Sequence, residues 1–148
     1  MNTSLKGKRI FIVEDSAKNR AVYQMILGFT GADIKYDHWG TETLLSLQTF
    51  KPDIIIMDLM LPEGISGFDI FAEIRRHPEY EQVPIVAISA ADPNASVPKC
   101  HTLGFAGFIA KPIETELLPD QLRRLLAGEQ VWYMGERYGG EIKEPQLL

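Results

Sequence analysis

Short apolar segments alternate with longer amphipathic ones along most of this chain, and this alternation limits the fold more strongly than any other sequence feature. Short apolar runs between turn signals are typical of buried strands, whereas apolar residues spaced three and four apart indicate helices. Five β–α repeats predict an α/β fold, in which crossover helices cover both faces of a parallel sheet. The segments expected to form strands are residues 8–13, 34–36, 53–57, 84–88 and 106–110.

Amphipathic segments follow each expected strand. The first is expected to begin at a Ser16 cap and to turn Val22, Met25 and Ile26 toward the core. The short, polar segment 34–36 has the character of an edge strand. The segments expected to form helices are residues 16–27, 41–47, 68–76, 97–103 and 114–128.

Two prolines constrain the later helices. Pro98 is expected to lie in the first turn of the fourth helix and to keep that helix short, because proline lacks the amide that an interior position needs. Pro119 would either interrupt the fifth helix or lie close to its start.

The composition is that of an ordinary soluble domain, with 148 residues, 45% of them hydrophobic and 24% charged. A net charge of -5 argues against nucleic acid as a direct partner, because a phosphate backbone requires a basic surface. No apolar run approaches the roughly 18 residues of a membrane span, and no signal peptide is recognisable. The single cysteine, Cys100, is expected to be an unreactive helix residue. It favours a reducing compartment, so we expect a cytoplasmic protein without a membrane partner.

Polar residues follow four of the five expected strands, where each apolar run stops. Glu14 and Asp15 come after the first strand, Asp58 after the third, Ser89 after the fourth and Lys111 after the fifth. Ligands of open parallel sheets bind outside the carboxyl ends of the strands, where the strand order reverses. With the order 2-1-3-4-5, the first and third strands flank that point, and we expect these side chains to meet there.

Three carboxylates in one pocket repel one another and need a cation. Oxygen ligands completed by water suit Mg²⁺. The metal would offset the charge of an incoming phosphoryl group, Asp58 would attack that group, and Lys111 and Ser89 would bind its oxygens. Taken singly, each residue also fits a plain role as a helix cap, a turn former or a solvated lysine. Their joint placement at four strand ends favours the functional interpretation.

With these motifs the sequence closely resembles the receiver domain of two-component response regulators, over about residues 8–126. The resemblance implies the flavodoxin-like fold of that family: a doubly wound, five-stranded parallel sheet of order 2-1-3-4-5 with five helices. The motifs are Glu14-Asp15, Asp58 within "DLMLP", Ser89-Ala90-Ala91 and Lys111-Pro112.

The resemblance implies a role for each site residue. Asp58 would be the phosphoacceptor that becomes an aspartyl phosphate. Asp15 would bind Mg²⁺ directly, Glu14 directly or through water, and the backbone carbonyl of Met60 would be a further ligand. Asp58 would also contribute an oxygen to the metal.

Three residues would respond to the phosphoryl group, according to the same resemblance. Lys111 and Ser89 would engage its oxygens, and Ser89 would move toward it. Phe108, three residues before the lysine, would be the switch aromatic that follows Ser89 inward. A plain core role for Phe108 stays open, because a phenylalanine in a strand is usually buried.

The resemblance implies a signalling switch rather than an enzyme with a separate substrate. The phosphoryl donor would be a histidine kinase or a histidine phosphotransfer protein, and output would pass through an unknown effector protein. A relay intermediate and a non-phosphorylated scaffold are the alternatives. A phosphatase with an aspartate nucleophile is disfavoured, because its acid–base aspartate would fall at Met60. Met60 and Ala91 offer no group that positions water, so we expect slow self-dephosphorylation.

The C-terminal segment differs in character from the rest of the chain. We expect residues 1–127 to form the receiver and residues 128–148 to be a tail without strands, a further domain or a DNA-binding output module. Disorder is one interpretation of this composition. In the other, Trp132, Tyr133 and Tyr138 pack on the body, on a partner or on a second copy of the chain, as in a homodimer.

Overall fold

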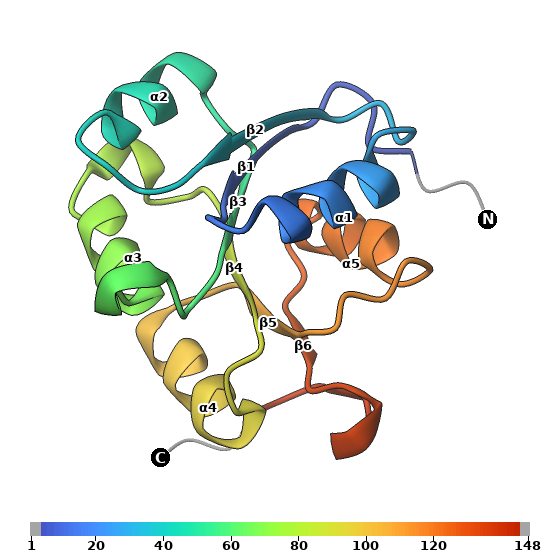
Figure 1. Cartoon of the computed structure of the whole chain (residues 1–148). Coiled ribbons are helices and arrows are strands. Elements are labelled where there is room, and N and C mark those ends of the chain that lie inside the picture. Colours follow the sequence, from blue (N-terminus) through green and yellow to red (C-terminus); the bar gives the residue numbers. More distant parts are fainter. Residues whose placement is uncertain (1–3, 146–148) are drawn as a thin grey trace.

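The computed structural model describes residues 4–145, in which helices cover both faces of a seven-stranded sheet (Figure 1). The strand order is β2-β1-β3-β4-β5-β6-β7, so the predicted order 2-1-3-4-5 is confirmed within a larger sheet. The strands are β1 (Arg9–Val13), β2 (Asp33–Asp37), β3 (Ile54–Met57), β4 (Ile85–Ser89), β5 (Gly107–Ala110), β6 (Val131–Tyr133) and β7 (Glu141–Ile142), and the α-helices are α1 (Ala17–Leu27), α2 (Thr43–Phe50), α3 (Gly67–Arg75), α4 (Pro93–Leu103) and α5 (Leu118–Leu126).

The core consists of two apolar layers, one on each face of the sheet. α1 and α5 cover one face, and α2, α3 and α4 cover the other (Figure 1). Successive residues of a strand point to opposite faces, so Ile55 and Met57 of β3 join one layer while Ile54 and Ile56 join the other. A strand buried on both faces has to be apolar throughout, and this explains the unbroken run that ends just before Asp58.

The predicted orientation of α1 was wrong for one of its residues. Ser16 is the N-cap, as predicted, and its side chain accepts a hydrogen bond from the Asn19 amide at 3.3 Å. Met25, however, is 62% exposed. The buried residues of the helix, Tyr23, Ile26 and Leu27, follow the three-and-four spacing of a core stripe that is offset from the predicted one.

Helix α4 is longer than predicted, because Pro98 does not restrict it. The helix begins at Pro93, where the fixed backbone angle of proline suits the first position, and Asp92 caps it by accepting a hydrogen bond from the Asn94 amide at 3.0 Å. Pro98 lies inside the helix and removes one amide donor from its ladder. Burial of Val97 and Cys100 against the sheet accompanies this loss. Pro119, by contrast, lies in the first turn of α5, near its start.

The prediction that the C-terminal segment contains no strand was also wrong. Residues 131–133 form β6, which runs parallel to β5, and residues 141–142 form β7, which returns antiparallel to β6. We call residues 131–142 the C-terminal hairpin. Trp132 and Tyr133 pack on the body of the protein, whereas Tyr138 is 41% exposed. Within residues 4–145, no helix combines the length and the apolar character that crossing a membrane requires.

Candidate functional site

The buried carboxylates Glu14 and Asp58 lie side by side at the carboxyl ends of β1 and β3. Val13 and Met57 are paired in the parallel ladder, so the residue that follows each strand lies at the same level. The Asp58 amide donates to the Val13 carbonyl at 3.3 Å and fixes this register. Only 3% of Glu14 and 8% of Asp58 are exposed, and buried carboxylates require a compensating charge.

Lys111 supplies that charge from the end of β5. Its Nζ donates to Glu14 Oε1 at 2.9 Å and to Asp58 Oδ2 at 3.0 Å, so one ammonium group bridges the two carboxylates. The Lys111 amide donates to the Ser89 carbonyl at 2.9 Å, which continues the ladder between β4 and β5. The Lys111–Pro112 peptide bond is cis.

The loop after β3 holds the second oxygen of Asp58. The Met60 amide donates to Asp58 Oδ1 at 3.1 Å, while the Met60 side chain is 57% exposed. Gly67 packs against this turn, and its amide donates to the Leu59 carbonyl at 3.0 Å. A Cβ at position 67 would lie 2.2 Å from the Asp58 carbonyl oxygen, so the backbone around Asp58 depends on a glycine at that place.

Ser89 and Phe108 are both buried. Ser89 Oγ accepts a hydrogen bond from the Ala91 amide at 3.2 Å, which orients the turn between β4 and α4. Phe108 points into the layer formed with α3 and α4. The structure therefore brings Glu14, Asp58 and Lys111 into contact, places Ser89 on the adjacent strand end and buries Phe108 behind it.

Asp15 lies at the exposed rim rather than in the bridged pair. It lines a cavity of about 210 Å³ together with residues of two loops, including His38, Trp39 and Glu63. The sequence interpretation did not identify these neighbours. They come from the connections after β2 and β3, whose path is set by tertiary packing.

The arrangement fits Mg²⁺ by the chemistry of its donors. In the described part of the chain, no group of three or more His, Cys, Asp or Glu side chains is arranged to hold a metal ion. Glu14 accepts hydrogen bonds from Lys111 and the Ser16 amide, and Asp58 accepts them from Lys111 and the Met60 amide. Each carboxylate oxygen has a further lone pair that a metal ion can use. Mg²⁺ keeps several waters and needs only one or two carboxylates. Asp15 and Asp58 with the Met60 carbonyl are oxygen donors of that kind and could hold the ion, and the contribution of Glu14, directly or through water, stays a prediction.

Tyr23 of α1 lies in the field of the two carboxylates, and the sequence interpretation missed it. Burial, followed by the negative charges of Glu14 and Asp58, raises the pKa of Tyr23 well above its ordinary value. The phenol therefore stays neutral beneath the site and adds no charge to it. The predicted buried face of α1 was displaced by one residue from the observed one, so it did not include Tyr23.

Cys100 is not part of the site. Burial raises the pKa of its thiol to about 12, so the reactive thiolate is scarce at neutral pH. The expectation of an unreactive helix residue fits this environment.

Comparison with known proteins identifies the same region. The family model described as "Response regulator receiver domain" matches residues 10–123. The polar-differentiation response regulator DivK of Brucella anthropi is 25% identical over 119 residues, which cover 80% of this chain and 96% of that protein. The phosphate regulon transcriptional regulatory protein PhoB of Rhizobium meliloti is 28% identical over 118 residues, but the matched region spans only 52% of its length.

A solved structure shares the fold. The receiver domain of sensor histidine kinase PA1611 from Pseudomonas aeruginosa superimposes with a TM-score of 0.71 and 28% identity, covering 82% of this chain and 98% of that one. That structure is described with a magnesium ion coordinated in the active-site cleft. The family match stops at residue 123 and leaves the C-terminal hairpin outside it.

Proposed function

Because the chain belongs to the response regulator receiver domain family, we propose that it is a phosphoacceptor of two-component signalling and that Asp58 receives the phosphoryl group. The observation that carries this proposal is the environment of Asp58. Its carboxylate is buried at a strand end, Lys111 Nζ lies 3.0 Å from one oxygen, and the Met60 amide lies 3.1 Å from the other. These contacts hold a nucleophile in one orientation beside a cation.

Phosphoryl transfer requires one bond to form and one to break. A carboxylate oxygen of Asp58 bonds to phosphorus, and the bond between phosphorus and the donor's histidine nitrogen breaks. Lys111 then leaves the Asp58 oxygen and binds a phosphoryl oxygen, and the Ser89 hydroxyl donates to another. When bound by Asp15, Asp58 and the Met60 carbonyl, Mg²⁺ supplies charge that offsets the phosphoryl group.

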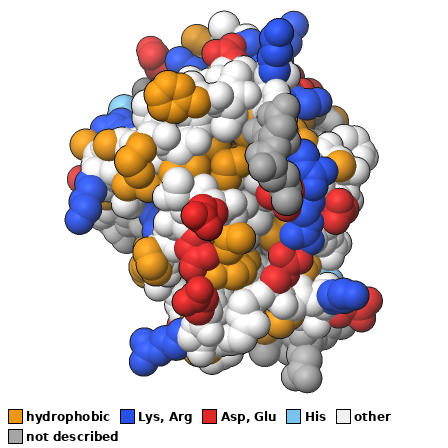
Figure 2. All heavy atoms as spheres, turned by 90° about the vertical axis from the view of Figure 1, so that its right-hand side faces the viewer, with side chains coloured by type: hydrophobic (Ala, Val, Ile, Leu, Met, Phe, Trp, Pro, Cys, Tyr) orange, Lys and Arg blue, Asp and Glu red, His pale blue; other side chains and the backbone are white. Residues whose placement is uncertain are grey.

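The proposed partner that donates the phosphoryl group is a histidine kinase or a histidine phosphotransfer protein. The face formed by α1 and α5 exposes apolar side chains among charged ones (Figure 2). Met25 of α1 and Phe29 of the following turn are both largely exposed. Exposed apolar side chains of this kind support a protein partner, and we propose that output also passes through protein binding.

We take residues 1–127 as the receiver and residues 128–148 as an addition without a domain of its own, because β6 and β7 join the same sheet. Relay intermediate and terminal switch remain alternatives within this function. A non-phosphorylated scaffold is the competing function, and it requires that Asp58 accept no phosphoryl group.

Asp58→Asn is expected to abolish phosphorylation, because an amide oxygen is a poor nucleophile toward phosphorus. The protein is incubated with Mg²⁺ and acetyl phosphate, and intact mass is measured. The wild type should gain one phosphoryl group and the variant none. Asp53→Asn, at an exposed carboxylate before β3, is the matched control and should be modified like the wild type. If the wild type gains no adduct, even with a histidine kinase as donor, the proposed function is wrong and the non-phosphorylated scaffold is supported instead.

The acyl phosphate is expected to be long-lived. Met60 and Ala91 flank the proposed reaction centre, and neither side chain has a group that could position an attacking water. Decay of the phosphorylated mass is followed after the donor is removed, with Mg²⁺ still present. A half-life of only seconds would contradict this expectation.

A further inference from the structure

The C-terminal hairpin covers a strand edge that would otherwise end the sheet. β6 pairs with β5 in the register Gly107–Val131, Phe108–Trp132 and Ile109–Tyr133. Trp132 joins the apolar layer beneath α4, and Tyr133 joins the opposite layer beneath α5. β6 therefore contributes side chains to both apolar layers, and it lies between α4 and α5 (Figure 1).

Gly107 is a point where the backbones of β5 and β6 approach each other closely. A Cβ at position 107 would lie 2.1 Å from the Val131 carbonyl oxygen and 3.0 Å from the Val131 carbonyl carbon. Any side chain there would displace β6. The close approach of the two backbones at this position depends on glycine.

Trp132 connects the hairpin with the buried aromatic next to the site. Its partner in the ladder is Phe108, and both side chains are fully buried in the same apolar layer. The imidazole of His101 on α4 packs edge-on against Trp132, with ring centroids 5.4 Å apart. A change in the packing of Phe108 or α4 must therefore change the packing of Trp132.

The turn of the hairpin borders the site from outside. Residues 133–138 line a cavity of about 390 Å³ together with Ala90 and Ala91, which follow Ser89, and with Lys111 and Pro112. The hairpin turn thus faces both loops that follow the proposed phosphoryl-binding residues across this cavity.

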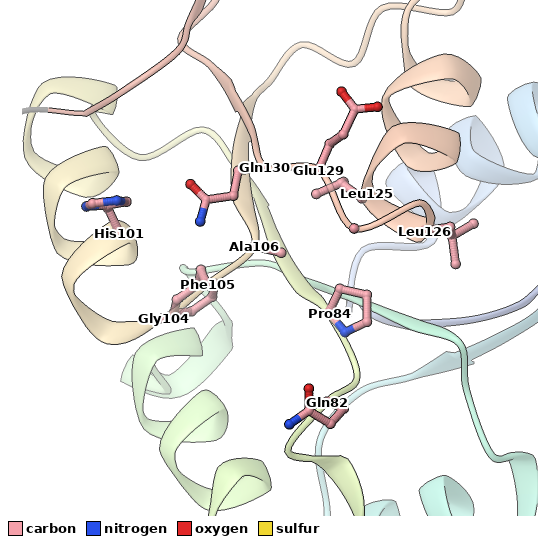
Figure 3. A pocket seen from close by; sticks show the side chains of 11 residues that line it. Gln82, Pro84, His101, Gly104, Phe105, Ala106, Leu125, Leu126, Glu129 and Gln130 are labelled. Carbon is pink, nitrogen blue, oxygen red and sulfur yellow. The ribbon is translucent and has the colours of Figure 1, made fainter.

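Another contact anchors the hairpin away from the site. Arg124 of α5 donates to both carboxylate oxygens of Glu141, at 2.8 and 2.6 Å. The segment that leads into β6, residues 128–130, borders open space. A cavity of about 350 Å³ lies there between α4 and α5, bordered by His101, Glu129 and Gln130 (Figure 3). The hairpin is the last element of the sheet, with a cavity at its turn and another beside the segment that leads into it, so it can separate from β5 while the other strands stay paired.

We propose that the C-terminal hairpin is an intrachain cap whose attachment is controlled by the site: docked while Asp58 is free, and loosened when Asp58 is phosphorylated. This inference rests on the proposed function. A phosphoryl group adds a charge of about -1.5 to -2. By the proposed mechanism it pulls Lys111 and Ser89 toward Asp58, and this changes the wall of the cavity that the hairpin turn lines. The same cavity is lined by three acidic side chains, Asp92, Glu114 and Glu136, and by two basic ones, Lys111 and Arg137. Once Lys111 pairs with the phosphoryl group, Arg137 is the one basic side chain left in this lining to balance the three acidic ones, and this weakens docking of the turn.

Hydrogen exchange of backbone amides tests the proposal directly. Full-length protein is compared before and after treatment with acetyl phosphate and Mg²⁺, and intact mass is measured on the same samples. Amides of residues 131–142 are expected to exchange about 5- to 150-fold faster in the phosphorylated protein, the range of typical coupling between sites. Amides of β2, at the opposite edge of the sheet, serve as the internal reference. Asp58→Asn should show no change.

Substitution at the anchor tests the reverse direction of the coupling. Arg124→Gln removes the contact with Glu141 and should speed hairpin exchange without phosphorylation. Because coupling between two equilibria is reciprocal, this variant should also bind beryllofluoride, an inert mimic of the phosphoryl group, more tightly than the wild type. Arg123→Gln is the matched control, since Arg123 pairs with Asp120 within α5 and, among residues 4–145, forms no ion pair or side-chain hydrogen bond with the hairpin. Gly107→Ala should act like Arg124→Gln.

The outcomes separate the two proposals. A phosphoryl adduct with faster hairpin exchange supports the cap. An adduct with unchanged or slower exchange overturns the cap and leaves the proposed function intact. Equal beryllofluoride affinity of the Arg124→Gln and Arg123→Gln variants also overturns the cap, because a merely structural hairpin would behave in that way. No adduct overturns the function and the cap together.

Discussion

Lys111→Met is expected to slow phosphorylation of Asp58 by about 10²–10³-fold, the usual effect of removing one preorganised group that stabilises developing charge. Lys111 Nζ is within 3.0 Å of the attacking carboxylate, and no other Lys or Arg pairs with Asp58 among the described residues. The rate is measured from the mass of the acetyl phosphate adduct over time. Lys35→Met, at an exposed position on β2, is the control and should react like the wild type.

The same substitution should also reduce stability. Glu14 and Asp58 would face each other, largely buried and without a cation, and removing one partner from a buried ion pair costs about 3–5 kcal/mol. Mg²⁺ bound by Asp15 and Asp58 would supply positive charge beside this pair and would stabilise the folded state by mass action. Added Mg²⁺ should therefore raise the urea midpoint of the Lys111→Met variant more than that of the wild type. Equal midpoints in the absence of Mg²⁺ would contradict the compensating role of Lys111.

The strand ends were predictable because two independent patterns agreed there. Each apolar run had to be buried on both faces, and a polar residue at its end had to lie at the sheet edge. This reasoning located Asp58, Glu14, Lys111 and Ser89, three of which the structure joins by hydrogen bonds at 2.9 and 3.0 Å. The direct contact of Lys111 with both carboxylates was beyond sequence reasoning, because it depends on side-chain geometry across three strands.

The errors have local physical causes. Pro98 was expected to limit α4, because an interior proline costs about 3 kcal/mol. Burial of Val97 and Cys100, together with the capping by Asp92, offsets that cost. The strand of residues 131–133 is too short for its period to stand out from a glycine-rich segment. It forms through contacts with β5, which are tertiary contacts that no local pattern records. Gly107 was the available signal, since a glycine inside a strand indicates a close approach of another backbone.

Trp132→Ala is expected to lower the free energy of unfolding by about 3–5 kcal/mol, the typical cost of truncating a buried tryptophan. Trp132 is 0% exposed and packs against the layer that contains Phe108. The free energy is measured by urea unfolding, followed by circular dichroism. Tyr138→Ala removes an aromatic ring from the same hairpin at an exposed position and should cost less than about 1 kcal/mol.

The size of this loss also shows whether the hairpin belongs to the cooperative fold. If residues 131–142 unfold together with the sheet, the full cost of the cavity at position 132 appears in the urea transition. The hairpin is then docked in the folded state and unfolded in the other state of the two-state equilibrium. A loss below about 1 kcal/mol in Trp132→Ala, equal to that of Tyr138→Ala, would contradict the prediction. The hairpin would then already be detached in the unphosphorylated protein. If docking of the hairpin contributes several kcal/mol to the free energy of unfolding, phosphorylation can weaken it measurably. Coupling between two sites typically amounts to about 1–3 kcal/mol, which is a substantial part of that contribution.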